Sequence, residues 1–141
     1  DFASGVEPVL QWELPKERKA FLETPGQQFD LLAGDPIDVQ IERLFAALDA
    51  ADGGDNGALF AAWRDGDVDT IATTIVDELA GDAEYGDKLL FDRNRNWIPT
   101  LEGLLANNDE DLVVVGAAHL AGTGSVLDLL AQAGYTVKRV Q

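Results

Sequence analysis

The sequence contains no cysteine, no methionine and only four lysines among its 141 residues. Without cysteine, the chain cannot form a disulfide, use a thiolate nucleophile or bind zinc through cysteine. No run of residues approaches the roughly 18 consecutive apolar positions that a membrane-spanning helix needs. These absences exclude classes of site but identify no cellular compartment. Because the first residue is Asp1 rather than methionine, we expect a processed or excised segment of a longer product.

Positive charge is scarce as well, since ten Lys and Arg face 26 Asp and Glu, which gives a formal net charge of -16. A field of this sign repels nucleic acids and anionic lipids, because both are bound through clustered Lys and Arg. The one local group of basic residues, Lys16, Arg18 and Lys19, is too small to change this. We therefore expect no nucleic-acid partner. Cations and basic peptides would be attracted, and a solubilising or salt-adapted surface is the alternative interpretation.

The length fits one domain, and a hydrophobic content of 46% is typical of a globular chain. The pattern predicts an α/β fold, rich in helices around a small, mostly parallel sheet. Strands are expected at residues 19–23, 112–116 and 135–140, and helices near 25–33, 36–48, 58–64, 68–80, 85–106 and 125–133. The run at 112–116 is continuously apolar, as in a strand buried on both faces. With the helix and strand that follow, it predicts a terminal β-α-β unit with a right-handed crossover.

Several helix boundaries and faces can be predicted from local patterns. Thr24, Pro25 and Gln27 suit the N-cap, first and third positions of a helix with a capping box, and Gly34 suits its C′ position. The next helix carries one apolar stripe, formed by Ile37, Ile41, Leu44, Phe45 and Leu48. The longest helix should have an inner face formed by Leu90, Trp97, Ile98, Leu101, Leu104 and Leu105, and Asn94 shares the side of Leu90, Trp97, Ile98 and Leu101.

His119, the single histidine, lies three residues beyond Gly116, just past the carboxyl end of the expected buried strand. Ligands bind at that edge of open α/β sheets. Gly116 would let the backbone turn sharply or approach another group closely. An imidazole there can shuttle a proton or bind a metal. A histidine that only bonds to its own loop fits the residues equally well.

Glu23 is the second candidate, because it ends an expected strand directly before a helix N-terminus. A carboxylate at this place can bind a metal or act as a general base. Alternatively, it stabilises the helix dipole, an effect of roughly 0.3–1 kcal/mol.

Arg93 and Asn94 on the longest helix form the third candidate. Arg93 could clamp a carboxylate with two hydrogen bonds, whether the carboxylate belongs to a ligand or to the protein. Asn94 shares the inner face, where an unpaired amide would cost roughly 1–3 kcal/mol, so it must find partners. A helix tied internally to a loop is the alternative. If the strands that end at Glu23 and Gly116 lie in one sheet, this helix should bring Arg93 and Asn94 over Glu23 and His119.

Taken together, these residues resemble the TraB/PrgY/GumN family, which includes the Tiki proteins. Three segments carry the resemblance: Leu22-Glu23-Thr24; Arg93-Asn94 followed by Trp97; and Val115-Gly116-Ala117-Ala118-His119-Leu120-Ala121-Gly122 with Gly134-Tyr135-Thr136-Val137. The resemblance spans nearly the whole chain. Members of this family carry two Gly-x-x-His motifs and a functional glutamate, and the motif at Gly116 and His119 is similar to the second. We therefore interpret residues 1–141 as the C-terminal portion of a single TraB/GumN-type domain, and expect the first motif upstream of Asp1.

The resemblance implies a metal-dependent hydrolase that acts on peptides and is incomplete in this chain. His119 and Glu23 would bind a divalent metal ion, and His119, Glu23 and Arg93 would be catalytic. Arg93, Asn94 and Gly116 would contact a peptide or other small-molecule ligand. The alternative is a non-catalytic module that captures such ligands in the same cleft.

Three further expectations follow. The isolated chain should be inactive, because its partner, the N-terminal half of the same protein, would supply the missing motif. An exposed strand edge could also pair two copies into a homo-oligomer. The residues do not identify a compartment, although the resemblance implies an extracytoplasmic one, periplasmic or membrane-associated.

Overall fold

A computed structural model describes residues 6, 9–10, 15–53, 57–107 and 109–140. It is 71% helix, and the described residues contain no strand, so the predicted α/β fold with a parallel sheet is wrong. The described ranges include the short 3-10 helices η2 (Lys16–Arg18) and η5 (Ala117–Leu120). The main helices are α2 (Pro25–Ala33), α3 (Ile37–Gly53), α4 (Gly57–Asp65), α5 (Val68–Ile71), α6 (Asp77–Gly81), α7 (Ala83–Gly86), α8 (Asp92–Ala106) and α9 (Val126–Gln132).

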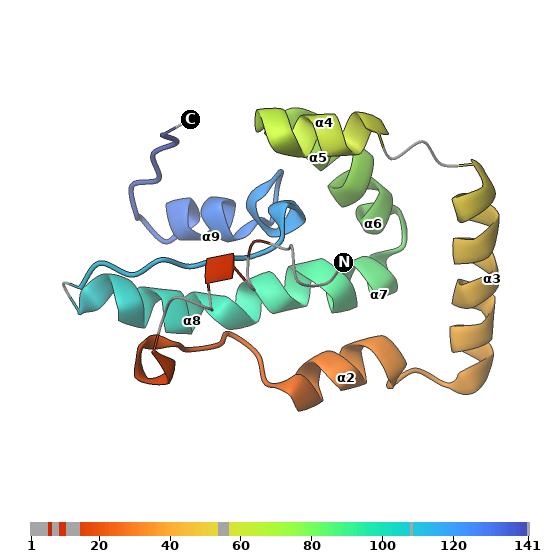
Figure 1. The fold of residues 1–141 in the computed structure, drawn as a ribbon, viewed down its shortest axis with the longest axis horizontal. Coiled ribbons are helices and arrows are strands. Elements are labelled where there is room, and N and C mark those ends of the chain that lie inside the picture. Colours follow the sequence, from red (N-terminus) through yellow and green to blue (C-terminus); the bar gives the residue numbers. More distant parts are fainter. Residues whose placement is uncertain (1–5, 7–8, 11–14, 54–56, 108, 141) are drawn as a thin grey trace.

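Helix α8 lies along the length of the molecule (Figure 1). Helix α9 packs beside it, and the segment leading into α2 runs along it through Leu22 and Glu23. Helix α3 stands at one end of the molecule, and α4 to α6 lie above α7 in the view of Figure 1. No helix in the described part of the chain is long and apolar enough to cross a membrane.

Helix α2 begins as its sequence predicts. Thr24 is the N-cap, its side chain accepts a hydrogen bond from the Gln27 backbone N–H, and the Gln27 side chain accepts one from the Thr24 backbone N–H. The end differs, because Gly34 is the C-cap and has φ -82°, not the left-handed conformation of a C′ glycine. A Cβ at Gly34 would lie 2.3 Å from the Asp30 carbonyl oxygen. The glycine thus permits close approach of two backbone segments rather than a left-handed turn.

The long helix expected near 85–106 is present, but its first part is not regular. Helix α7 continues into the π-helical segment η4 (Asp87–Phe91) and then into α8. A second π-helical segment, η3 (Ala72–Val76), lies between α5 and α6. Such segments admit an extra residue per turn and often occur near functional sites. Here η4 ends directly before Arg93 and Asn94.

The inner face of this helix is buried as predicted at Leu90, Trp97 and Leu101, whereas Ile98 and Leu104 are half-buried and the prediction is wrong for Leu105, which is 55% exposed. Leu90 belongs to one apolar cluster, with Ala62, Ile71, Val76 and Ala121. Trp97 and Leu101 belong to a second, with Val126. Along this helix, Asn94 lies between Leu90 of the first cluster and Trp97 of the second, and it is completely buried. One polar side chain therefore interrupts an otherwise apolar stripe, and its hydrogen bonds decide whether the stripe is stable.

The three segments predicted as strands are not strands. Leu22 and Val115 both pack on the second apolar cluster around Trp97 and Leu101 of α8, so a helix provides the packing surface that a sheet was expected to provide. Strand pairing needs a partner backbone, and apolar β-branched residues favour an extended chain without supplying one. Leu112 and Val140 are 75% and 90% exposed, unlike residues of a buried strand. Helix α9 exists, but without paired strands there is no β-α-β crossover.

This correction bears on the expected homo-oligomer. That expectation depended on an exposed strand edge, and the described residues offer none. Self-association stays a prediction, but it has lost this structural basis.

Candidate functional site

Glu23 and Arg93 form an ion pair that joins segments 70 residues apart in sequence. Arg93 Nε donates to Glu23 Oε1 at 2.6 Å, and Arg93 Nη2 donates to Glu23 Oε2 at 3.0 Å. A third donor, Nη1, bonds to the Leu89 carbonyl at 3.0 Å, which fixes the guanidinium on its own helix. The two side chains are 11% and 22% exposed, so the pair is largely shielded from water. Such a two-pronged contact is the strongest and most directional form of an Arg–carboxylate pair.

Trp97 connects this ion pair to the histidine. Its indole Nε1 donates to Glu23 Oε1 at 3.1 Å, and its ring lies 4.5 Å from the imidazole of His119, centroid to centroid. The Arg93 guanidinium lies 5.1 Å from the centroid of the Trp97 ring, within cation–π range. The indole therefore contacts every charged or titratable member of the site.

His119 is held in place by the short helix η5 and is only 8% exposed. Its backbone N–H donates to the Gly116 carbonyl at 3.0 Å, which closes a tight turn. Gly116 has φ -59° and ψ 144°, a conformation that any residue adopts, and a Cβ there would lie 3.7 Å from His119 Cδ2. The structure therefore places Gly116 as the carbonyl acceptor of the turn and shows no need for a glycine. A role in binding substrate stays a prediction.

Asn94 fixes the orientation of the imidazole. Its Nδ2 donates to the Gly124 carbonyl at 2.8 Å, which leaves Oδ1 pointing at His119 Nδ1, 2.6 Å away. An amide oxygen only accepts, so Nδ1 must carry the proton of the neutral ring. The other nitrogen, Nε2, then has a free lone pair. Among the described residues it has no hydrogen-bond partner, and it is not a fully buried unsatisfied atom.

The electrostatics of the site keep His119 neutral and Glu23 charged. Burial lowers the pKa of His119 to about 4; the positive charge of Arg93 contributes to this, and Glu23 opposes it. Burial would raise the pKa of Glu23, but the hydrogen bonds and charge of Arg93, with smaller effects of Gln28 and Trp97, hold this pKa below 4.5. Near neutral pH, the site holds a carboxylate, a guanidinium and an uncharged imidazole.

These residues fit a metal site only in part. His119 offers an oriented, neutral Nε2, which is the usual form of a histidine ligand. Both oxygens of Glu23 already accept hydrogen bonds from Arg93, and Oε1 also accepts one from Trp97. No group of three or more His, Asp and Glu side chains that could hold a metal ion lies within the described ranges. The described site therefore supplies one open ligand, and further ligands would have to come from elsewhere.

The predicted convergence is present, although no sheet edge produces it. Glu23, Arg93, Asn94 and His119 are linked by hydrogen bonds and by the ring of Trp97. The prediction assigned Trp97 to the apolar face and missed its polar contact. Trp97 follows Arg93 by four residues and Asn94 by three, and residues at these spacings lie on the same face of a helix. This spacing was the signal that could have placed Trp97 in the site. Nothing in the sequence indicated that the Gly124 carbonyl accepts a hydrogen bond from Asn94.

No curated protein and no solved structure matches this sequence. The profile of the TraB/PrgY/gumN family matches residues 3–139, and these include every residue of the site just described. The suspected resemblance is thereby confirmed: the chain belongs to the TraB/PrgY/gumN family.

Proposed function

We propose that this chain carries part of the catalytic site of a metal-dependent hydrolase that acts on peptides. His119 would bind the metal through Nε2. The observation that supports this most directly is the pair of hydrogen bonds at Asn94, because together they fix the ring and leave Nε2 unprotonated. Histidine ligands in metal sites are typically oriented in this way, by an acceptor for their second ring nitrogen.

The lowered pKa favours a ligand over a general base. A general base works best when its pKa lies near the working pH, and a pKa of about 4 makes His119 a weak base at neutral pH. The same pKa suits a metal ligand, because the imidazole needs no deprotonation before it binds.

In this proposal Glu23 positions other side chains and does not bind the metal itself. It holds the Arg93 guanidinium and the Trp97 indole in fixed places around the imidazole. Arg93 would orient a substrate carboxylate, since a bound anion could share its donors with Glu23. The remaining metal ligands would come from outside the described residues, as the family resemblance implies. A divalent ion bound there lowers the pKa of a bound water and polarises a carbonyl group.

One observation favours the alternative, a module that captures peptides without cleaving them. The carboxylate that should complete the metal site is engaged by Arg93 with two hydrogen bonds. Capture would need only the guanidinium and the indole. The two proposals differ in whether metal binding depends on His119.

Elemental analysis of the intact natural protein separates them. A hydrolase should contain close to one divalent ion per chain, and His119→Ala should lose most of it together with peptide cleavage. Ser125→Ala, which removes a buried helix cap near the site, serves as the control and should keep the metal. Equal metal content in the wild type and His119→Ala would refute the proposed ligand role. Peptide binding without metal or cleavage would support capture.

A further inference from the structure

The apolar stripe of α3 is exposed rather than buried. Its five side chains are between 46% and 70% exposed: Ile37, Ile41, Leu44, Phe45 and Leu48. We call them the α3 stripe. An amphipathic helix in a globular protein normally turns such a stripe toward the core or a partner. Figure 1 shows α3 standing at one end of the molecule.

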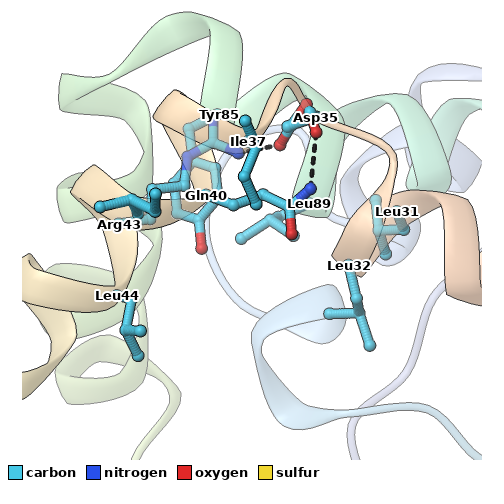
Figure 2. Close-up of a pocket in the computed structure, with 10 residues that line it drawn as sticks. Leu31, Leu32, Asp35, Ile37, Gln40, Arg43, Leu44, Tyr85 and Leu89 are labelled. Carbon is cyan, nitrogen blue, oxygen red and sulfur yellow. Dashed lines mark hydrogen bonds and ion pairs between the residues drawn. The ribbon is translucent and has the colours of Figure 1, made fainter.

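The stripe continues into an open pocket of about 420 Å³ between α2, α3 and the segment from α7 into η4. Figure 2 shows the side chains that surround it. The apolar part of the lining consists of Leu31, Leu32, Ile37, Ile41, Leu44 and Leu89. Leu32 at its mouth is 75% exposed. A cavity of this size and lining fits one or two large apolar side chains.

The polar groups of the pocket already bind one another. Asp35 accepts a hydrogen bond from Lys88 at 2.6 Å. It also forms an ion pair with Arg43, which Figure 2 shows. The Arg43 guanidinium also lies 4.2 Å from the centroid of the Tyr85 ring. Gln40 donates to the carbonyls of Ala33 and Asp35. Asp35 is shared by both nearby cations, so this group of three side chains keeps a net charge of +1, on the Gln40 and Arg43 side of α3.

The outer edge of the α3 stripe is acidic. Asp38 and Glu42 each follow a stripe residue by one position, so they are turned by about 100° to the same side. Both are exposed, and neither forms an ion pair with a described residue. Arg43 and Gln40 lie on the opposite edge, toward Asp35. The surface thus combines apolar side chains with unpaired negative charge along one border.

We propose that the α3 stripe and its pocket bind a cationic amphipathic peptide segment. A large apolar side chain of the segment fills the pocket, and its Lys or Arg side chains pair with Asp38 and Glu42. Charge complementarity selects this occupant. A second copy of this chain would bring the same acids and a net charge of -16, and nucleic acids and anionic lipids are repelled for the same reason. The proposal does not depend on hydrolysis, because it concerns binding alone.

The test uses the intact protein and an 18-residue synthetic helix with leucine on one face and lysine on the other. Calorimetry near 0.15 M salt should detect binding. Ile41→Ser combined with Leu44→Ser should weaken it at least about tenfold, since two apolar contacts are lost. Asp38→Asn combined with Glu42→Gln should weaken it about threefold to tenfold, and the loss should shrink at high salt. Circular dichroism checks that each exposed substitution leaves the helix content unchanged.

Matched controls guard against non-specific attraction to an acidic protein. Leu105→Ser combined with Leu112→Ser removes apolar side chains that are 55% and 75% exposed elsewhere. Asp109→Asn combined with Glu110→Gln removes two exposed acids elsewhere. Each control should change the affinity less than about twofold.

Several results would overturn the proposal. These are no binding of the Leu/Lys helix, equal losses in the control pairs, or equal binding of a helix with every Lys replaced by Glu. Dimerisation that Ile41→Ser with Leu44→Ser abolishes would assign the surface to a second copy. Binding to zwitterionic vesicles that the same variant abolishes would assign it to a lipid surface.

Discussion

The indole of Trp97 and the imidazole of His119 lie 4.5 Å apart, centroid to centroid, at an interplanar angle of 42°. Trp97 also donates a hydrogen bond to Glu23, so the indole contacts both the ion pair and the face of the histidine ring. The site therefore behaves as one packed unit, in which Asn94 holds one edge of the imidazole and Trp97 covers its face. Its parts can be tested separately.

The titration of His119 is the first test. Its pKa should lie near 4, because burial and the charge of Arg93 oppose protonation. As the only histidine, it gives a single set of imidazole NMR signals, and nitrogen shifts should report the Nδ1–H tautomer. A pKa near the ordinary 6.5, or an Nε2–H tautomer, would contradict the site described above.

The same shift makes stability depend on pH. Between about pH 6.5 and 4 the unfolded chain binds a proton at His119 and the folded chain does not, so stability falls as pH falls through this window. The size is of the order of 3 kcal/mol, from about 1.4 kcal/mol per pKa unit. Urea denaturation at pH 7 and pH 4.5 measures it. In His119→Gln this part of the slope should disappear, while the part due to other groups remains.

Asn94→Asp tests the acceptor role of the amide. A carboxylate would still accept from His119 Nδ1, but its charge should raise the pKa of His119 by at least about one unit. It would also lose the donor to the Gly124 carbonyl, at a cost of about 1–3 kcal/mol in unfolding free energy. Asn96→Asp is the matched control, because Asn96 lies on the exposed face of the same helix. An equal pKa change in both variants would argue against a direct contact.

A double-mutant cycle measures the Glu23–Arg93 pair. With Glu23→Gln and Arg93→Met, we expect a coupling energy of about 1–3 kcal/mol, because the pair is shielded and two-pronged. Arg64 and Asp65 form a comparison pair whose side chains are 62% and 60% exposed, and their coupling should stay below about 1 kcal/mol. Equal couplings in urea denaturation would mean that shielding by α8 adds nothing.

Salt should stabilise the protein. Repulsion among the net 16 negative charges weakens as the Debye length falls from about 10 Å at 0.1 M salt to about 3 Å at 1 M. The melting temperature should therefore rise with sodium chloride, and potassium chloride should act alike if screening is the cause. A flat or falling melting temperature would contradict this expectation.

Local patterns predicted the parts of the structure that depend on neighbours in sequence. The capping box at Thr24 and the buried face from Leu90 to Leu101 follow from hydrogen bonds or spacings within a few residues. Local patterns could not decide whether the three expected strands form, since a strand exists only when a distant backbone pairs with it. Val115 shows the difference: its apolar neighbours indicate an extended segment, but its packing partner is α8.

The candidate site was likewise predictable only where neighbours in sequence indicate it. Polar residues at unusual places, such as Asn94 on an apolar face, pointed to the right side chains. Their pairing did not follow, because Glu23 and Arg93 are 70 residues apart and nothing local says that each satisfies the other. The fixed tautomer of His119 depends on the Gly124 carbonyl, which every residue type would provide.

The π-helical turn in η4 sets the rotation of α7 about the helix axis relative to α8. Removal of one residue within Asp87–Phe91 would restore the ordinary pitch and rotate α7 by about 100° relative to α8. Tyr85 on α7 would then point in another direction relative to α8, while Arg93, Asn94 and Trp97 would keep their mutual spacing. A change of a single residue in length would therefore redirect α7 and the surface that packs on it, without altering the spacing of the side chains that α8 supplies around His119. Natural length variation at this turn would produce relatives with the same chemistry and differently aimed surfaces.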